Sequence, residues 1–146
     1  MNPKVLEYNC RFGDPETQPI MLRLKSDLIE MIQTCFSGSI SDYKVEWDQR
    51  SAMGIVMSSI GYPESYETVK EIFGLETLVN KDDIKVFHSG TRLKNENVLT
   101  NGGRVLCVTA LGNDLNHSNL NAYSAVKQID WKGKYYRSDI GFRVMK

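Results

Sequence analysis

The chain has 146 residues, which suits one domain, or one small domain and part of another. Hydrophobic residues make up 41% and charged residues 25%, and 18 basic residues balance 18 acidic ones. This composition is typical of a globular protein, and the lack of a basic stripe argues against a nucleic-acid partner. No apolar run is long enough to span a bilayer, so we expect no membrane partner. The cysteines are few and widely spaced, which predicts reduced thiols in a cytoplasmic protein rather than disulfides or a zinc site: Cys10, Cys35 and Cys107.

Residues 4–9 alternate apolar and polar side chains, which predicts a strand. Residues two apart share a face of a strand, about 7 Å from each other, so Glu7 and Asn9 would project together. Mg²⁺ takes such oxygen ligands, usually one or two carboxylates plus substrate phosphates. The alternative is an exposed strand end before a helix cap, because Glu and Asn at this spacing are common.

A charged loop follows at residues 11–18 and contains Arg11, Asp14 and Glu16. Charges this dense in a turn are poorly placed for a core. They are well placed for a binding or catalytic site, since loops carry such residues more often than regular elements do.

Apolar residues recur at spacings of three and four over residues 18–36, which predicts one helix with its apolar stripe in the core. Asp14 or Thr17 could cap this helix, and Gly38 would end it. Because helix N-termini attract anions, the charged loop could hold a carboxylate or a phosphate. The stripe comprises Met21, Leu24, Leu28, Met31 and Cys35.

Residues 41–50 form a polar connection, in which Trp47 is expected to anchor the chain onto the core. We place a domain boundary near Asp42. This boundary divides the chain into residues 1–42 and residues 43–146.

The second part begins with a buried strand predicted at residues 52–59. Gly-Tyr-Pro at residues 61–63 forces a turn, and residues 66–75 are expected to form a short extended segment. Residues 84–88 alternate as a further strand that ends in His88. A lone histidine is more often structural than catalytic, although its pKa suits either role.

Residues 98–100 and 104–111 are strand-like and flank the glycine turn, Asn101-Gly102-Gly103. Asn-Gly between two such runs predicts a hairpin, because both turn positions need a positive φ. Both faces of residues 104–111 are apolar, which predicts a central strand covered on both sides. The glycine turn is either a plain tight turn or a site where its backbone N–H groups and Arg104 face a phosphate or nucleotide.

Asp114 is placed to cap a second helix. One face of that helix carries Leu115, Ala122, Val126 and Ile129. Residues 135–143 are predicted to form a last extended segment. Its charges could line a site or form surface ion pairs, and they belong to Arg137, Asp139 and Arg143.

The run Arg11-Phe12-Gly13-Asp14-Pro15-Glu16-Thr17-Gln18 resembles the signature of the phosphoribosylamine–glycine ligases, also called glycinamide ribonucleotide synthetases, which are ATP-grasp enzymes. Ile60 departs from this pattern, since the family usually has a glycine there. The resemblance covers nearly the whole chain but only the C-terminal part of such an enzyme. Further similar stretches follow in the same order: Lys25-Ser26-Asp27-Leu28, Gly61-Tyr62-Pro63, Val86-Phe87-His88-Ser89-Gly90-Thr91, Thr100-Asn101-Gly102-Gly103-Arg104-Val105-Leu106 and Asp139-Ile140-Gly141.

The resemblance implies an α+β fold. Residues 1–42 would be the end of an ATP-grasp domain, with a strand, the charged loop and a helix. Residues 43–146 would be a small domain with a mixed β-sheet and a packed helix. The missing N-terminal part of the ligase, with its amine-binding domain and nucleotide-binding lysines, would be a partner.

The implied reaction is the ATP-dependent joining of glycine and 5-phosphoribosylamine through glycyl phosphate. It yields glycinamide ribonucleotide, ADP and phosphate in purine biosynthesis. Glu7 and Asn9 match the metal pair of the family and would hold Mg²⁺ or Mn²⁺. The cation would neutralise the oxygens of the triphosphate as the glycine carboxylate approaches it. Asn101, Gly102, Gly103 and Arg104 would contact ATP.

Catalytic roles fall on the charged loop. Arg11 would clamp the transferring phosphoryl group or the substrate carboxylate, because a guanidinium binds oxyanions in a bidentate way. Asp14 and Glu16 would orient the glycine ammonium or the substrate amine, or else pair with Arg11 and shape the loop. We expect the isolated chain to be inactive; the alternative is a non-catalytic docking module.

Overall fold

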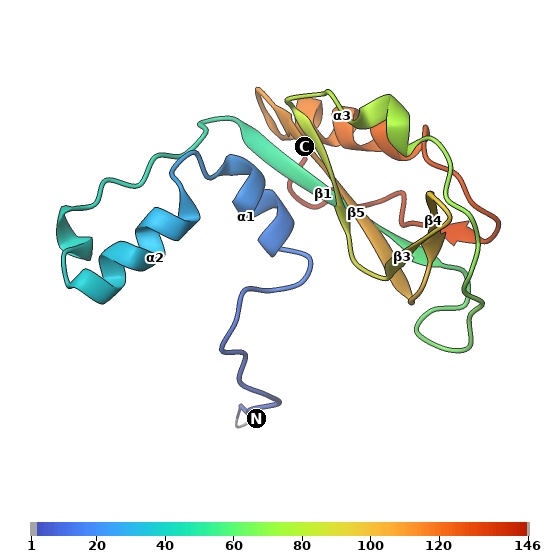
Figure 1. Cartoon of the computed structure of the whole chain (residues 1–146), viewed down its shortest axis with the longest axis horizontal. Coiled ribbons are helices and arrows are strands. Elements are labelled where there is room, and N and C mark those ends of the chain that lie inside the picture. Colours follow the sequence, from blue (N-terminus) through green and yellow to red (C-terminus); the bar gives the residue numbers. More distant parts are fainter. Residues whose placement is uncertain (1–2, 146) are drawn as a thin grey trace.

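The computed structural model describes residues 3–145, which form two antiparallel sheets with helices around them (Figure 1). Its helices and strands follow in chain order: α1 (Thr17–Arg23), α2 (Leu28–Ser37), the 3-10 helix η1 (Ile40–Asp42), β1 (Ser51–Ser59), the 3-10 helix η2 (Leu75–Leu78), β2 (Ile84–His88), β3 (Thr91–Lys94), β4 (Asn97–Thr100), β5 (Arg104–Gly112), α3 (Leu115–Val126) and β6 (Lys134–Tyr135). No helix in residues 3–145 is long and apolar enough to cross a membrane.

The main sheet has the strand order β2-β5-β1-β6, and its long central pair is β1 with β5. Their register runs from Ser51 opposite Gly112 to Ser58 opposite Arg104. Almost every residue of β5 is buried, which confirms the central strand predicted at residues 104–111. All pairings are antiparallel, so the mixed sheet expected from the sequence is wrong.

The two faces of β1 have different neighbours because side chains alternate along a strand. Met53, Ile55 and Met57 lie in the core, which α3 completes with small and branched side chains from its inner face. Gly54 faces the other way and lies under Pro19 of α1, where a Cβ would be 3.0 Å from the proline ring. Helix α1 therefore covers the face of the sheet opposite to α3.

Helix α3 confirms the prediction for its start, since the Asp114 carboxylate accepts a hydrogen bond from the His117 N–H at 2.8 Å. Ala122 and Val126 are fully buried on its inner face, whereas Leu115 at its first turn is half-exposed. The last extended segment is shorter than predicted. Only Lys134–Tyr135 pairs as a strand, and the chain then turns.

The predicted hairpin across the glycine turn is wrong. Strand β4 pairs with β3, whereas β5 pairs with β1 and β2, so residues 101–103 carry the chain from the small sheet to the main one. The tight hairpin turn lies at Asn95 and Glu96, which have φ values of 48° and 66°. These positive values are what a two-residue hairpin turn requires.

The strand predicted at residues 4–9 is also wrong, since residues 3–10 form no helix or strand and pair with no strand in the described chain. Their apolar side chains face solvent, and Leu6 is 97% exposed. A strand needs a neighbouring backbone to satisfy its N–H and C=O groups, and residues 3–145 provide none here.

The single helix predicted at residues 18–36 is two helices. The chain is extended at Leu24, and the Asp27 carboxylate accepts a hydrogen bond from the Glu30 N–H at 3.0 Å to cap α2. Asp27 followed three residues later by Glu30 is a helix-start pattern that the apolar periodicity obscured.

The predicted core stripe of this region is wrong as well, because neither α1 nor α2 has a buried residue. Figure 1 shows α2 standing away from the sheet, beside η1. Leu28 of the stripe is 39% exposed, and Phe36, a further apolar residue of α2, is 88% exposed. Trp47 does not anchor on the core; it bridges to Leu24 and is 41% exposed.

Asp48 holds the polar connection at residues 41–50 in place beside the main sheet through hydrogen bonds. The residue is only 8% exposed, and its side chain receives hydrogen bonds from Arg50, while its carbonyl accepts two from Arg23 at the end of α1. Arg50 also forms an ion pair with Asp83, next to β2. The hydrogen bonds from Arg50 hold the pKa of the Asp48 carboxyl well below its usual range.

We expect Asp48→Asn to lower the melting temperature at pH 7 and to weaken acid destabilisation. The depressed pKa gives stability that is fully present above the unfolded pKa, near 3.8, and is lost as pH falls below it. Thermal melts at pH 7 and pH 3 measure the effect. Asp82→Asn, at an exposed aspartate in the turn before β2, is the control and should change neither melt. An unchanged melting temperature in Asp48→Asn would contradict this role.

Val69 is a branched residue with a φ of 62°, in the left-handed region that costs an L-residue about 1–2 kcal/mol. Val69→Gly should therefore raise the free energy of unfolding by about 0.5–1 kcal/mol, after the greater freedom of glycine in the unfolded chain is subtracted. Val79→Gly is the matched control, because Val79 is also exposed but has a φ of −60°. Urea titrations should show that the control loses about 1 kcal/mol.

Candidate functional site

The structure brings the charged loop and the end of the glycine turn together. Asp14 in the loop forms an ion pair with Arg104 at the start of β5, with 2.9 Å between Oδ2 and Nη1. Both side chains are about half-exposed. Two segments that are ninety residues apart in the chain thus meet at one end of the main sheet.

Local hydrogen bonds shape the charged loop. The Thr17 N–H and hydroxyl both donate to the Gly13 carbonyl, at 3.0 and 2.6 Å. The Glu16 side chain folds over Gly13 so closely that a Cβ there would overlap its carboxylate. Arg11 donates to the Phe12 carbonyl at 3.0 Å and pairs with neither carboxylate of the loop.

Glu7 and Asn9 lie close together, as expected from their spacing, although no strand holds them. The Asn9 amide N–H₂ donates to the Glu7 carboxylate at 3.0 Å, and both residues are exposed. Residues 3–145 contain no group of three or more His, Cys, Asp or Glu side chains that could hold a metal ion. A cation here would need further ligands from its substrate or from another segment.

The glycine turn is packed tightly rather than open. The Asn101 N–H donates to the Gly90 carbonyl at 2.7 Å, and the carbonyls of Gly102 and Gly103 accept hydrogen bonds from Ser59. A Cβ on Gly103 would overlap the ring of Tyr62. The glycines therefore provide space for close contacts, since neither has a positive φ.

A cavity of about 280 Å³ lies beside the ion pair, between the charged loop, β1 and the chain after β6. We call it the arginine cavity, because the charged residues that line it are Arg104 and Arg137. The other residues that line it are aromatic, aliphatic or small: Pro15, Gly54, Val56, Ser58, Tyr62, Tyr135, Tyr136 and Ile140.

Arg137 is fixed in this wall by two sets of contacts. Its guanidinium makes two hydrogen bonds to Asp139, at 2.8 and 2.7 Å, and these lower the pKa of that carboxyl. Its carbonyl accepts a hydrogen bond from the Tyr123 hydroxyl at 2.7 Å, and burial raises the pKa of that phenol. The sequence singled out Arg137 only as one of several terminal charges, and its place in a cavity depends on α3.

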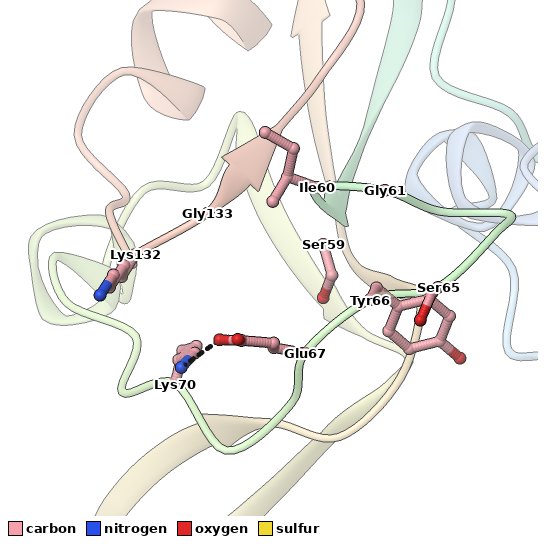
Figure 2. A pocket seen from close by; sticks show the side chains of 9 residues that line it. All are labelled: Ser59, Ile60, Gly61, Ser65, Tyr66, Glu67, Lys70, Lys132 and Gly133. Carbon is pink, nitrogen blue, oxygen red and sulfur yellow. Dashed lines mark ion pairs between the residues drawn. The ribbon is translucent and has the colours of Figure 1, made fainter.

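A larger and more open hollow of about 500 Å³ lies near Lys70 and Lys132 (Figure 2). We call it the lysine cleft. Figure 2 shows the Glu67 carboxylate directed at the Lys70 ammonium, to which it pairs at 2.6 Å. This hydrogen bond lowers the pKa of Glu67. The site residues predicted from the sequence do not line this cleft, which carries both signs of charge.

The remaining candidate side chains take no part in these hollows. His88 is exposed, and its Nδ1 lies 3.0 Å from the Thr91 hydroxyl, which fits the structural interpretation. Cys10 and Cys35 are exposed free thiols, and burial raises the pKa of the Cys107 thiol.

Comparisons with known proteins match this chain to one family. The family model "Phosphoribosylglycinamide synthetase, C domain" matches residues 52–143. A phosphoribosylamine–glycine ligase of Salmonella typhimurium is 50% identical over 146 residues, covering 99% of this chain and 34% of that protein. One of Pseudomonas putida is 47% identical over 144 residues, covering 99% and 33%. The chain thus spans about a third of the length of these relatives.

A solved structure is similar too. The crystal structure of the phosphoribosylamine–glycine ligase of Thermotoga maritima aligns with a TM-score of 0.70 and 31% identity, over 94% of this chain and 33% of that one.

Gly103→Ala should lower the free energy of unfolding by about 1–3 kcal/mol, because the added methyl group overlaps the Tyr62 ring. The same change in a Tyr62→Ala background should cost clearly less, since the ring is then absent. A double-mutant cycle measured by urea unfolding tests this. Equal costs in the two backgrounds would show that Tyr62 does not set the requirement for glycine.

Proposed function

Because the chain belongs to the phosphoribosylglycinamide synthetase C-domain family, we propose that it is the C-terminal part of a phosphoribosylamine–glycine ligase. The observation that carries the proposal is the ion pair between Asp14 and Arg104. It joins the charged loop, which resembles the signature of these ligases, to the domain that the family model matches. A similar arrangement of nearly the whole chain in the Thermotoga maritima ligase supports it.

The proposed reaction joins glycine to 5-phosphoribosylamine at the expense of ATP. The glycine carboxylate attacks the γ-phosphate and releases ADP, which gives glycyl phosphate. The substrate amine then displaces phosphate from the acyl carbon, and glycinamide ribonucleotide is formed. The enzyme must bring two negative groups together, so cationic donors near the oxygens are its main requirement.

In this proposal, Arg11 contacts the transferring phosphoryl group or the glycine carboxylate. Its guanidinium is exposed and is held only to a backbone carbonyl, so its other N–H donors can take an oxyanion. Glu16 orients an ammonium or amine group of a substrate. Asp14 does the same, or it positions Arg104, and the observed ion pair supports the second role.

Glu7 and Asn9 are the residues that would hold Mg²⁺ or Mn²⁺. Their donor atoms are of the type that Mg²⁺ prefers, a carboxylate and an amide oxygen. The remaining coordination positions would be left for substrate phosphates. Asn9 must turn its amide, since the nitrogen now faces the carboxylate. A bound ion would supply charge neutralisation at the phosphate oxygens.

Arg104 is the member of the predicted nucleotide-contacting group that reaches a cavity. Residues 101–103 would support it through their packing, since the Asn101 N–H is already bonded to Gly90. The glycine turn would then meet a phosphate group through Arg104 rather than through its backbone N–H groups.

Residues 1–42 would be the end of an ATP-grasp domain, with the boundary near Asp42 at the end of η1. The exposed apolar side chains of residues 3–12 and of α2 support this division, because the N-terminal part of such a ligase would cover them. These include Leu6, Tyr8, Phe12, Ile29 and Phe36. The use of ATP fits the expected cytoplasmic location.

An ADP-release assay with ATP, Mg²⁺, glycine and phosphoribosylamine tests the proposal. It is run on the chain alone and on the chain mixed with the N-terminal two-thirds of a related ligase. We expect turnover only in the mixture, and a loss of at least a hundredfold with Glu7→Ala, because a ligand to the metal is then removed.

Glu76→Ala, at an exposed glutamate in η2, is the control and should keep full turnover. Turnover by the chain alone would contradict the expectation that the ATP site lies elsewhere. A folded mixture that associates without turnover would favour the alternative of a non-catalytic docking module.

A further inference from the structure

We propose that the arginine cavity binds a phosphorylated five-carbon sugar, whose phosphate contacts Arg104 and Arg137. The inference rests on the proposed function, in which one substrate carries a phosphoribosyl group. It assigns that group to a cavity formed within this chain, and it gives a binding role to Arg137, for which the sequence left a site role and a surface ion pair as alternatives.

The charge of the cavity favours a phosphate. Its charged lining residues are two arginines, whereas their carboxylate partners, Asp14 and Asp139, lie outside the lining. Arg137 uses Nε and Nη2 for Asp139, and Arg104 uses Nη1 for Asp14. The remaining N–H groups of each guanidinium are left for a ligand, and a guanidinium binds phosphate oxygens in a bidentate way.

The size of the cavity favours a sugar phosphate over a whole nucleotide. Its volume of about 280 Å³ lies just below the range of about 300–1,000 Å³ typical of ligand sites. Its tyrosine rings offer flat apolar surfaces and hydroxyl groups, which suit the faces and hydroxyls of a furanose. The Tyr62 ring is held by Gly103 and packs edge-on against Tyr66, with 6.0 Å between the ring centroids.

Hydrogen bonds from α3 hold the wall that carries Arg137. The Tyr123 hydroxyl donates to the Arg137 carbonyl and accepts from the Ile140 N–H, at 2.7 and 3.1 Å. The Asn119 amide donates to the Ile140 carbonyl at 3.0 Å. Little ordering of this segment is then required on binding, which favours affinity.

The lysine cleft is the competing place for an anion. There the Glu67 carboxylate already occupies Lys70, so an incoming phosphate would meet a negative charge (Figure 2). The arginine cavity has no carboxylate in its lining. We therefore assign the phosphate to the arginines.

Titration of the ¹⁵N-labelled 146-residue chain with ribose 5-phosphate, followed by amide NMR shifts, tests the assignment. We expect saturable shifts at Tyr62, Arg104 and Arg137. Ribose should cause none, and inorganic phosphate should bind more weakly than the sugar phosphate. ATP should not produce the same pattern of shifts at matched concentration.

Arg137→Gln should weaken binding about tenfold or more, because a charge-assisted pair of hydrogen bonds is lost. Arg143→Gln is the matched control, since the Arg143 guanidinium lies over the Phe142 ring outside the cavity and its loss should leave Kd within twofold. In the complemented enzyme, Arg137→Gln should raise KM for phosphoribosylamine while KM for glycine and ATP stays unchanged. The amide spectra of both variants check that the fold is kept.

Three results would overturn the assignment: no shifts with millimolar ribose 5-phosphate, shifts centred on Lys70 and Lys132, or equal affinity in Arg137→Gln. Equal affinity for inorganic phosphate would overturn the recognition of the sugar. Turnover of the complemented enzyme without ribose 5-phosphate binding would reject this inference and keep the proposed function. Binding without turnover would support this inference and reject the proposed function.

Discussion

The register between β1 and β5 is the constraint on which the rest of the structure depends. With Ser51 opposite Gly112 and Ser58 opposite Arg104, alternate residues of β1 face the core under α3 or the arginine cavity on the other side. A shift of one residue would exchange these two faces and turn Ile55 and its core neighbours toward solvent. The core and the cavity are thus two results of a single pairing. The same pairing puts Arg104 at the strand end where the charged loop can reach it.

The parts of the fold that periodicity specifies were predictable. Strands β1, β2 and β5 carry strong apolar patterns, and Asp114 is a standard helix cap. The glycine turn was misinterpreted because Asn-Gly has two physical uses: a positive φ in a hairpin, or room for a close approach. The second applies here, since a Cβ on Gly102 would be 3.0 Å from the Gly90 Cα and one on Gly103 would overlap the Tyr62 ring. The true hairpin turn contains Glu96, which seldom adopts a positive φ and gives little signal.

Apolar spacing also shows which side chains share a face but not what covers that face. The helix stripe and the strand pattern of the first forty residues are present in the sequence, yet residues 3–145 leave Leu6 of the strand pattern and Leu28 of the stripe exposed. For the site, the residue types of the charged loop indicated charge chemistry. Its link to Arg104 spans ninety residues, and no local pattern encodes a pairing at that distance. Arg137 was visible as a charge, but the hydrogen bond of its carbonyl to Tyr123 depends on how α3 packs.

The half-exposed ion pair between Asp14 and Arg104 makes the charged loop sensitive to ionic strength. Exposed pairs are worth about 0–1 kcal/mol, and physiological salt screens charges over about 8 Å. Thermal fluctuations therefore separate this pair readily, while Pro19 keeps α1 packed on Gly54 behind it. Rising salt frees the guanidinium of Arg104 from its carboxylate and also screens it from an incoming phosphate. These two effects oppose each other, so occupancy by an anion falls less steeply with rising salt than it would at an arginine without a carboxylate partner.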